Sequence, residues 1–122
     1  MNTINEIQRE IYEALSASYD TYDIPDADAK LPFVRIGDIS WEKHKEKVFG
    51  IECYNIRQEI HVWSDYEGKK EVLEISEDVE GILEGISYDD YSVINNEVIS
   101  TQINDLDGYK QAVIMLDLKL DN

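Results

Sequence analysis

Residues 54–83 read YNIRQEIHVWSDYEGKKEVLEISEDVEGIL and join a strand-like half directly to a helix-like half. In the first half, Ile56, Ile60 and Val62 alternate with other residues at the period of two that a half-buried strand requires. The opposite strand face carries Arg57, Glu59, His61 and Trp63. In the second half, apolar residues recur at spacings of three and four, which predicts an amphipathic helix. That stripe consists of Val72, Ile75, Val79, Ile82, Leu83 and Ile86.

The start of this helix is predicted at a capping box, because Ser64 stands three residues before Glu67. The apolar stripe of such a helix has to pack on the sheet to which the preceding strand belongs. We therefore interpret residues 54–83 as a scaffold unit rather than as a catalytic centre.

The remaining chain supplies one more helix and three more strands. We expect a helix over residues 4–17, an irregular acidic loop over 18–30, a strand over 31–41, and strands over 93–103 and 109–120. Asp107-Gly108 between the last two strands predicts a hairpin turn. The order helix, strand, strand, helix, strand, strand predicts an α+β fold in a single domain, residues 1–122, with a sheet of about four strands and both helices packed on one face.

The last strand has two unequal faces. Ala112, Ile114, Leu116, Leu118 and Leu120 share one apolar face, whereas the other face carries Val113 and Met115 before Asp117 and Lys119. Since this second face is only partly polar, we expect something to cover part of it.

The formal net charge of −16 over 122 residues limits the partners of this protein. It argues against ordinary binding to the nucleic-acid backbone, which requires a surplus of Lys and Arg, and against docking on an anionic membrane. The single cysteine, Cys53, allows no intrachain disulfide and favours an intracellular setting. Glu6, Arg9 and Glu10 occupy the place where a signal peptide would need an apolar core.

Residues 42–47, EKHKEK, hold three of the eleven basic residues of the chain, between Trp41 and Phe49. Two interpretations are open. Charge runs usually face water, which would make this a solvated hairpin loop. Alternatively, Lys43, Lys45 and Lys47 form a basic prong that meets an acidic surface on another subunit.

No residue pattern points to catalysis, a cofactor or a metal. His44 and His61 lack the spacing of a zinc site, and Cys53 lacks the surroundings of a nucleophile. A calcium loop aligned on Gly108 would place Ile103 and Ile114 at two essential carboxylate positions, so that motif fails. The sequence also lacks a glycine-rich phosphate loop and a GxSxG elbow. We therefore do not expect an enzyme.

The whole pattern resembles the tail-completion, or tail-terminator, proteins of long-tailed bacteriophages and prophages. The features that carry the resemblance are the N-terminal helix, LPFV (31–34) at the start of the first strand, QEIHVW (58–63), the acidic helix that starts near Tyr66, and the alternating strand 112–120. The resemblance implies a structural protein of the virion that forms a ring, usually a hexamer. This ring would cap the tail-tube protein, end tube polymerisation and join the tail to a head-completion or connector protein.

A ring built from head-to-tail contacts needs two different complementary patches on each subunit. The sequence offers a basic loop and an acidic helix face for this role, flanked by aromatic residues. The expected interface residues are Trp41, Lys43, His44, Lys45, Lys47, Phe49 and Trp63 on one side and Glu71, Glu74, Glu77 and Asp78 on the other. A negatively charged channel would also let DNA pass through without specific binding. The alternatives are an acidic DNA-mimic inhibitor of a DNA-binding enzyme, another phage neck connector, or an uncharacterised binding domain.

Overall fold

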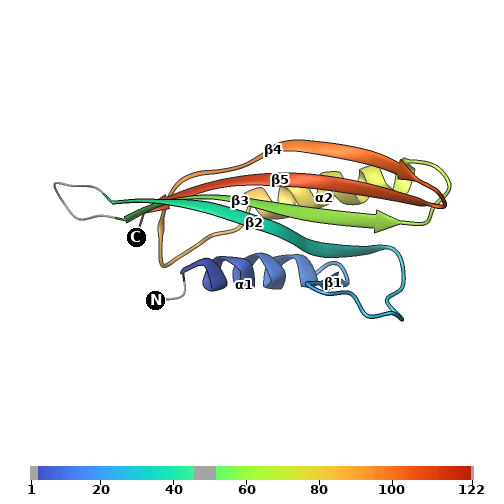
Figure 1. The fold of residues 1–122 in the computed structure, drawn as a ribbon, viewed down its shortest axis with the longest axis horizontal. Helices are drawn as coiled ribbons and strands as arrows, with labels where there is room; N and C mark the ends of the chain where they lie inside the picture. Colours follow the sequence, from blue (N-terminus) through green and yellow to red (C-terminus); the bar gives the residue numbers. More distant parts are fainter. Residues whose placement is uncertain (1–2, 46–51, 122) are drawn as a thin grey trace.

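The structure, a computed structural model, describes residues 3–45 and 52–121. Its elements are α1 (Thr3–Ser16), β1 (Thr21–Tyr22), β2 (Phe33–Lys45), β3 (Glu52–Ser64), α2 (Lys70–Glu84), β4 (Ser92–Leu106) and β5 (Tyr109–Asp121). They form an α+β fold with a five-stranded sheet of order β1-β2-β3-β5-β4 (Figure 1). β1 pairs with β2 in parallel, and the other neighbours are antiparallel.

The expected number of four strands is corrected to five. The additional strand, β1, lies inside the segment 18–30 that the sequence analysis assigned to an irregular loop. Thr21 and Tyr22 align with Val34 and Arg35, and the Val34 N–H donates to the Asp20 carbonyl at 2.9 Å. A strand of two residues is too short to show a period of two, so the alternation of side chains could not reveal it.

One hydrophobic core lies between the sheet and the two helices, which both pack on the same face. α1 contributes Ile7, Ile11 and Leu15, and α2 contributes Val72, Val79 and Leu83. The sheet contributes the predicted apolar faces of β3 and β5: Ile56, Ile60, Val62, Ala112, Ile114, Leu116, Leu118 and Leu120. Full burial of each large aliphatic side chain stabilises the fold by roughly 1.5–3 kcal/mol. The Asp107-Gly108 turn is confirmed, with Gly108 at a φ of 79°.

A β-bulge in β2 decides which side chains of this strand face the helices. Ile36 pairs with Ile60, but Ile39 pairs with Gln58, so β2 has one residue more than β3 between these pairs. Before the bulge, even-numbered residues such as Ile36 face the helices; after it, odd-numbered residues do. Buried Gln58 holds the bulge, because its Nε2 donates to the carbonyls of Gly37 and Asp38 at 3.0 and 3.2 Å.

The predicted capping box at the start of α2 is wrong. The helix starts at Lys70, with Lys69 at the N-cap position and no side-chain cap. Ser64 instead accepts from the Tyr66 N–H at 3.2 Å and donates to Glu71 at 2.7 Å. Ser64 thus fixes the connection between β3 and α2, and the helix begins six residues after it.

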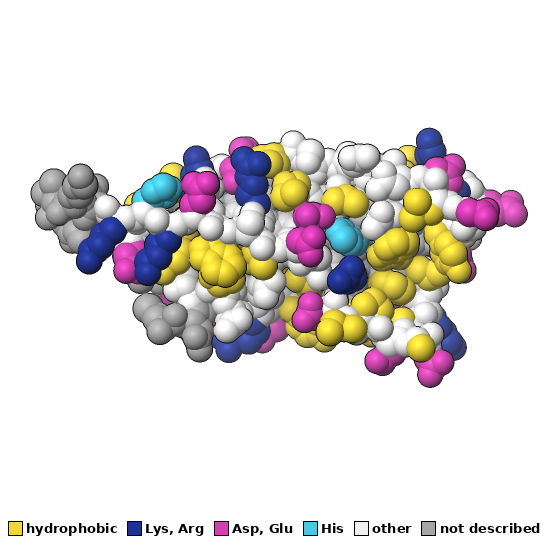
Figure 2. Space-filling view, in the orientation of Figure 1, with side chains coloured by type: hydrophobic (Ala, Val, Ile, Leu, Met, Phe, Trp, Pro, Cys, Tyr) yellow, Lys and Arg dark blue, Asp and Glu magenta, His cyan; other side chains and the backbone are white. Residues whose placement is uncertain are grey.

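The face of the sheet opposite the helices is the outer face. Within the described residues, no helix or further strand covers it, and Figure 2 shows this face with its mixed apolar and charged side chains. Val113 and Met115 are half-buried there by their neighbours in the sheet. The expected cover of this face is therefore not supplied by the described part of the chain.

Candidate functional site

The hairpin end of β2 and β3 forms a basic arm, defined as residues 39–45 and 52–57, in which β3 also pairs with β5 as far as Cys53. Trp41, Lys43 and Lys45 pair with Ile56, Tyr54 and Glu52 respectively. β5 reaches only to the level of Cys53, which pairs with Asp121. Figure 1 shows the arm extending past the first turn of α1. Residues 42–45 are thus strand rather than the expected loop; Lys47 and Phe49 lie outside the described residues.

The bulge divides the expected interface residues of the arm between two faces. Trp41 and Lys43, and by alternation Lys45, lie on the side of the helices, where Trp41 is 50% exposed. Lys43 Nζ lies 3.4 Å from Glu52 Oε1 and 5.8 Å from the centre of the Tyr54 ring.

The contact with Lys43 lowers the pKa of Glu52 below its usual value. His44 lies on the outer face, 3.5 Å from Glu42. Among the described residues of the arm, Trp41, Lys43 and Lys45 therefore form an aromatic and basic surface on the helix side, whereas His44 and Arg57 lie on the outer face.

The acidic helix face, Glu71, Glu74, Glu77 and Asp78, is only partly available for a partner. Glu71 accepts from Ser64, and Asp78 accepts from the Tyr19 hydroxyl. Burial, together with the Asp78 carboxylate, raises the pKa of Tyr19 to about 12. Glu74 and Glu77 are exposed, and no ion pair is recorded for either of them among the described residues. The structure thus leaves these two as the accessible pair of the four.

Trp63 lies far from the arm, at the other end of β3 and on the outer face. It contributes to an apolar hollow of about 340 Å³, lined by Pro25, Ala29, Leu31, Phe33, Arg35, Trp63 and Tyr109. Figure 2 shows apolar side chains gathered at this end of the outer face. The sequence analysis did not find this surface, because segment 23–31 has no periodicity that would place it beside Trp63. The apolar run Leu31-Pro32-Phe33 was the available signal.

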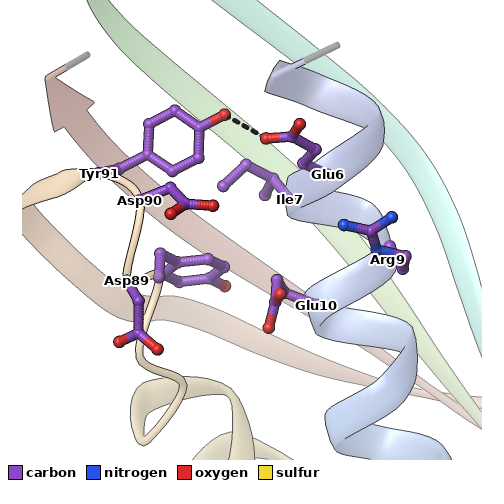
Figure 3. A pocket seen from close by; sticks show the side chains of 8 residues that line it. Glu6, Ile7, Arg9, Glu10, Asp89, Asp90 and Tyr91 are labelled. Carbon is purple, nitrogen blue, oxygen red and sulfur yellow. Dashed lines mark hydrogen bonds between the residues drawn. The ribbon is translucent and has the colours of Figure 1, made fainter.

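A second depression, between α1 and the segment that precedes β4, serves the fold rather than a ligand (Figure 3). Its volume is about 20 Å³, enough for about one water molecule. Tyr91 donates to Glu6 at 2.7 Å across it. Burial raises the pKa of Tyr88, which packs in the same place. These contacts attach the segment to α1.

Within residues 3–45 and 52–121, no group of three or more His, Cys, Asp or Glu side chains is arranged to hold a metal ion. In the same residues, no helix is long and apolar enough to cross a membrane. His61, expected on the exposed strand face, is on the outer face with Nε2 at 3.1 Å from Glu59.

Comparisons with known proteins identify the family. No curated protein matches the chain. A chain in the solved structure "Virion of native gene transfer agent (GTA) particle" has the same fold, with a TM-score of 0.79, 14% sequence identity, and 95% of each chain covered. The family model "Tail completion protein gp17" matches residues 10–118.

That match spans nearly the whole chain. It includes residues 31–34, β3, α2, most of β5 and the second half of α1, which are the features on which the resemblance depended. The family is one of structural tail proteins rather than enzymes. The chain therefore belongs to the tail completion protein gp17 family and is a structural protein of a phage-type virion, located in its tail or neck.

Proposed function

We propose that this protein is a tail terminator, which assembles into a closed ring of about six subunits at the head-proximal end of the tail tube. The family match over residues 10–118 is the observation that carries this proposal. The ring stops tube polymerisation and then joins the tail-tube protein to a head-completion or connector protein. A closed ring needs two different surfaces on each subunit, and the arm and the acidic helix face supply them.

In the proposed ring, the basic arm of one subunit contacts α2 of the next. Lys43 and Lys45 would meet Glu74 and Glu77, which are exposed, whereas exposed Asp78 already accepts a hydrogen bond from Tyr19. Trp41 would contribute apolar contact area beside the charges, as aromatic residues often do at the centre of interfaces. On this side of the sheet, β2 pairs over residues 39–45 only with β3, so the arm can contact a neighbour without displacing a strand of its own sheet.

The negative charge of −16 per subunit suits a channel through which DNA moves. A wall that repels phosphates leaves the DNA mobile, whereas a basic wall would bind it. DNA thus passes through the ring without specific binding. The same charge is the only support for the alternative function, a DNA mimic.

The first experiment is to measure mass in solution by light scattering coupled to size exclusion, with and without purified tail-tube protein. A ring of about six subunits, formed alone or on mixing with tube protein, is the expected result. A monomer or dimer that ignores tube protein but blocks a nuclease from its DNA would instead favour the mimic. A ring that binds only head-side proteins would point to another neck connector.

Charge exchange tests the interface. The variant K43E/K45E should lose ring formation, and adding E74K/E77K should restore it because the two charges are then exchanged across the contact. The matched control is R9E/K119E, which changes the net charge by the same amount at two exposed residues outside both the arm and the apolar hollow. If K43E/K45E still forms rings, the arm is not part of the ring interface.

A further inference from the structure

The apolar hollow is a large non-polar concavity on a strongly acidic protein. The side chains of Leu31, Phe33 and Trp63 are only half-buried there, and Tyr109 is 47% exposed. The hollow has a firm base, since Phe33 pairs with Trp63 across two strands and packs edge-to-face on Tyr22, with 5.4 Å between the ring centres. Pockets that bind partners are typically of this kind, mainly apolar with a few polar groups at fixed positions.

The margin of the hollow is negatively charged. Asp23, Asp26 and Asp28 are exposed in the same segment that supplies Pro25 and Ala29 to the lining. On the opposite side, Asp105 and Asp107 are exposed in the turn before Tyr109. Figure 2 shows carboxylates around the apolar side chains at this end of the molecule.

The one basic residue in the lining is already bound within the chain. Arg35 Nε donates to the Asp23 carbonyl at 3.1 Å, a bond that anchors the segment beside the hollow. Lys110 pairs with Asp105 at 3.0 Å. Asp26, Asp28 and Asp107 have no recorded ion pair among the described residues, so the margin keeps an excess of negative charge.

We propose that the apolar hollow binds an apolar or aromatic side chain flanked by Lys or Arg, presented by a different virion protein that abuts the ring along the tail axis. The apolar group would fill the hollow, and the flanking cations would meet the carboxylates of its margin. This inference rests on the proposed ring, because the ring defines which surfaces remain for axial neighbours.

A second copy of this chain is the less suitable occupant. The arm is where its aromatic and basic residues occur together, and the proposed ring contact already uses the arm. The other described basic residues that are exposed are spread over α1, segment 23–31, β3, the start of α2 and β5: Arg9, Lys30, Arg57, Lys69, Lys70 and Lys119. A different protein is therefore needed to supply the complementary chemistry.

The test uses two hollow variants, W63A for the lining and D26K/D28K for the margin. The control variants are I94S, which changes an apolar residue 61% exposed on β4, and D89K/D90K, which changes two exposed carboxylates elsewhere. Ring mass is measured by light scattering, and binding is measured by co-sedimentation with assembled tail tubes and, separately, with purified connector protein. D26K/D28K involves only exposed side chains and keeps the test valid if W63A does not fold.

We expect both hollow variants to form rings of normal mass and to lose at least tenfold in affinity for either the tubes or the connector, while the controls bind normally. If the wild type forms the ring without a partner protein, loss of that ring in D26K/D28K would show that a second copy occupies the hollow and would overturn the inference. If the rings of W63A and of D26K/D28K bind both tail tubes and connector protein normally, the inference about the hollow is overturned. The ring proposal is unaffected by that result. A wild-type chain that forms no ring with any partner refutes the ring proposal itself.

Discussion

Gln58 shows how one buried side chain sets the direction of the arm. Its side chain is 1% exposed, donates to the carbonyls of Gly37, Asp38 and Glu59, and accepts from Gln8 at 3.0 Å. These bonds fix the bulge, and the bulge turns Trp41 and Lys43 toward the helix side. A polar residue at a core position of β3 is thus explained by the shape of β2.

We expect Q58L to lower the free energy of unfolding by about 1–2 kcal/mol, because it leaves the part-buried carbonyls at the bulge without their donor. Urea unfolding measures this. The control is Q102L on β4, whose exposed amide bonds only to Asn104. Equal stabilities of the two variants would show that Gln58 does not hold the bulge.

Tyr19 gives a pH prediction. Its folded-state pKa is about 12, above the ordinary value of 10, because burial and the Asp78 carboxylate oppose ionisation. The folded state therefore favours the neutral phenol. The resulting stability is complete below pH 10 and is lost as the pH rises from 10 to 12.

The absorbance at 295 nm is titrated with pH for the wild type and for Y19F. The difference between the two curves should show a tyrosine that ionises near pH 12. In urea, the wild type should lose more stability than Y19F between pH 9 and pH 11. The D78N variant provides the control, since removing the carboxylate should shift the Tyr19 pKa back toward 10. A difference spectrum that titrates at pH 10 in the wild type would contradict the Tyr19–Asp78 contact.

At the scale of elements, the outer edge of β4 is protected by α2. This edge strand has two bulges, and the Glu84 carboxylate accepts from the Val98 N–H at 3.0 Å. Such features keep an edge strand from pairing with other chains. Without this protection, exposed Ile94 and Ile99 would favour aggregation through β4.

E84A should therefore aggregate faster on warming than the wild type, at a cost in unfolding free energy of only about 0.5–1.5 kcal/mol. Light scattering at a fixed temperature follows the aggregation. E97A removes the same charge from β4 itself without freeing the Val98 N–H, so it is the matched control. If E84A and E97A aggregate alike, the loss of charge explains the effect and the contact with Val98 does not.

Side-chain periodicity predicted the elements that bury one complete face. β3, α2 and β5 each present a long apolar stripe, and all three stripes lie in the core. β1 was missed because two residues show no period, and the start of α2 was misplaced because Ser64 caps a turn before the helix. Side-chain periodicity could not predict the bulge in β2 either, because the bulge is held by the side chain of Gln58 on another strand.

At the scale of the whole molecule, the candidate surfaces were predictable to different degrees. The basic run 42–47 was visible in the composition of the sequence. One of its two interpretations, a solvated hairpin loop, is corrected for Glu42 to Lys45, which are exposed but belong to a strand. The hollow depends on contacts between segment 23–31, β2, β3 and the start of β5, which no local pattern reports. Glu71 and Asp78 were chosen by helical spacing, which could not show their bonds to Ser64 and Tyr19.

The net charge of −16 per subunit also determines how ring assembly should depend on salt. Repulsion between whole subunits acts over distances comparable to the Debye length, which falls from about 30 Å at 0.01 M salt to about 8 Å at 0.15 M. The proposed contact of Lys43 and Lys45 with Glu74 and Glu77 acts at shorter range, so the same salt weakens it less. Assembly should therefore strengthen between 0.01 M and 0.15 M salt, and Mg²⁺ should promote it at lower concentration.

Sedimentation velocity at 0.01, 0.15 and 1 M salt separates the two effects. At 1 M the Debye length is about 3 Å, so the arm contact is also screened and assembly should weaken again. The K43E/K45E variant lacks the attraction and should form no ring at any of the three salt concentrations. Steady weakening of the wild-type ring from the lowest salt upward would mean that attraction at the interface outweighs repulsion between subunits, and the net charge would then not limit assembly.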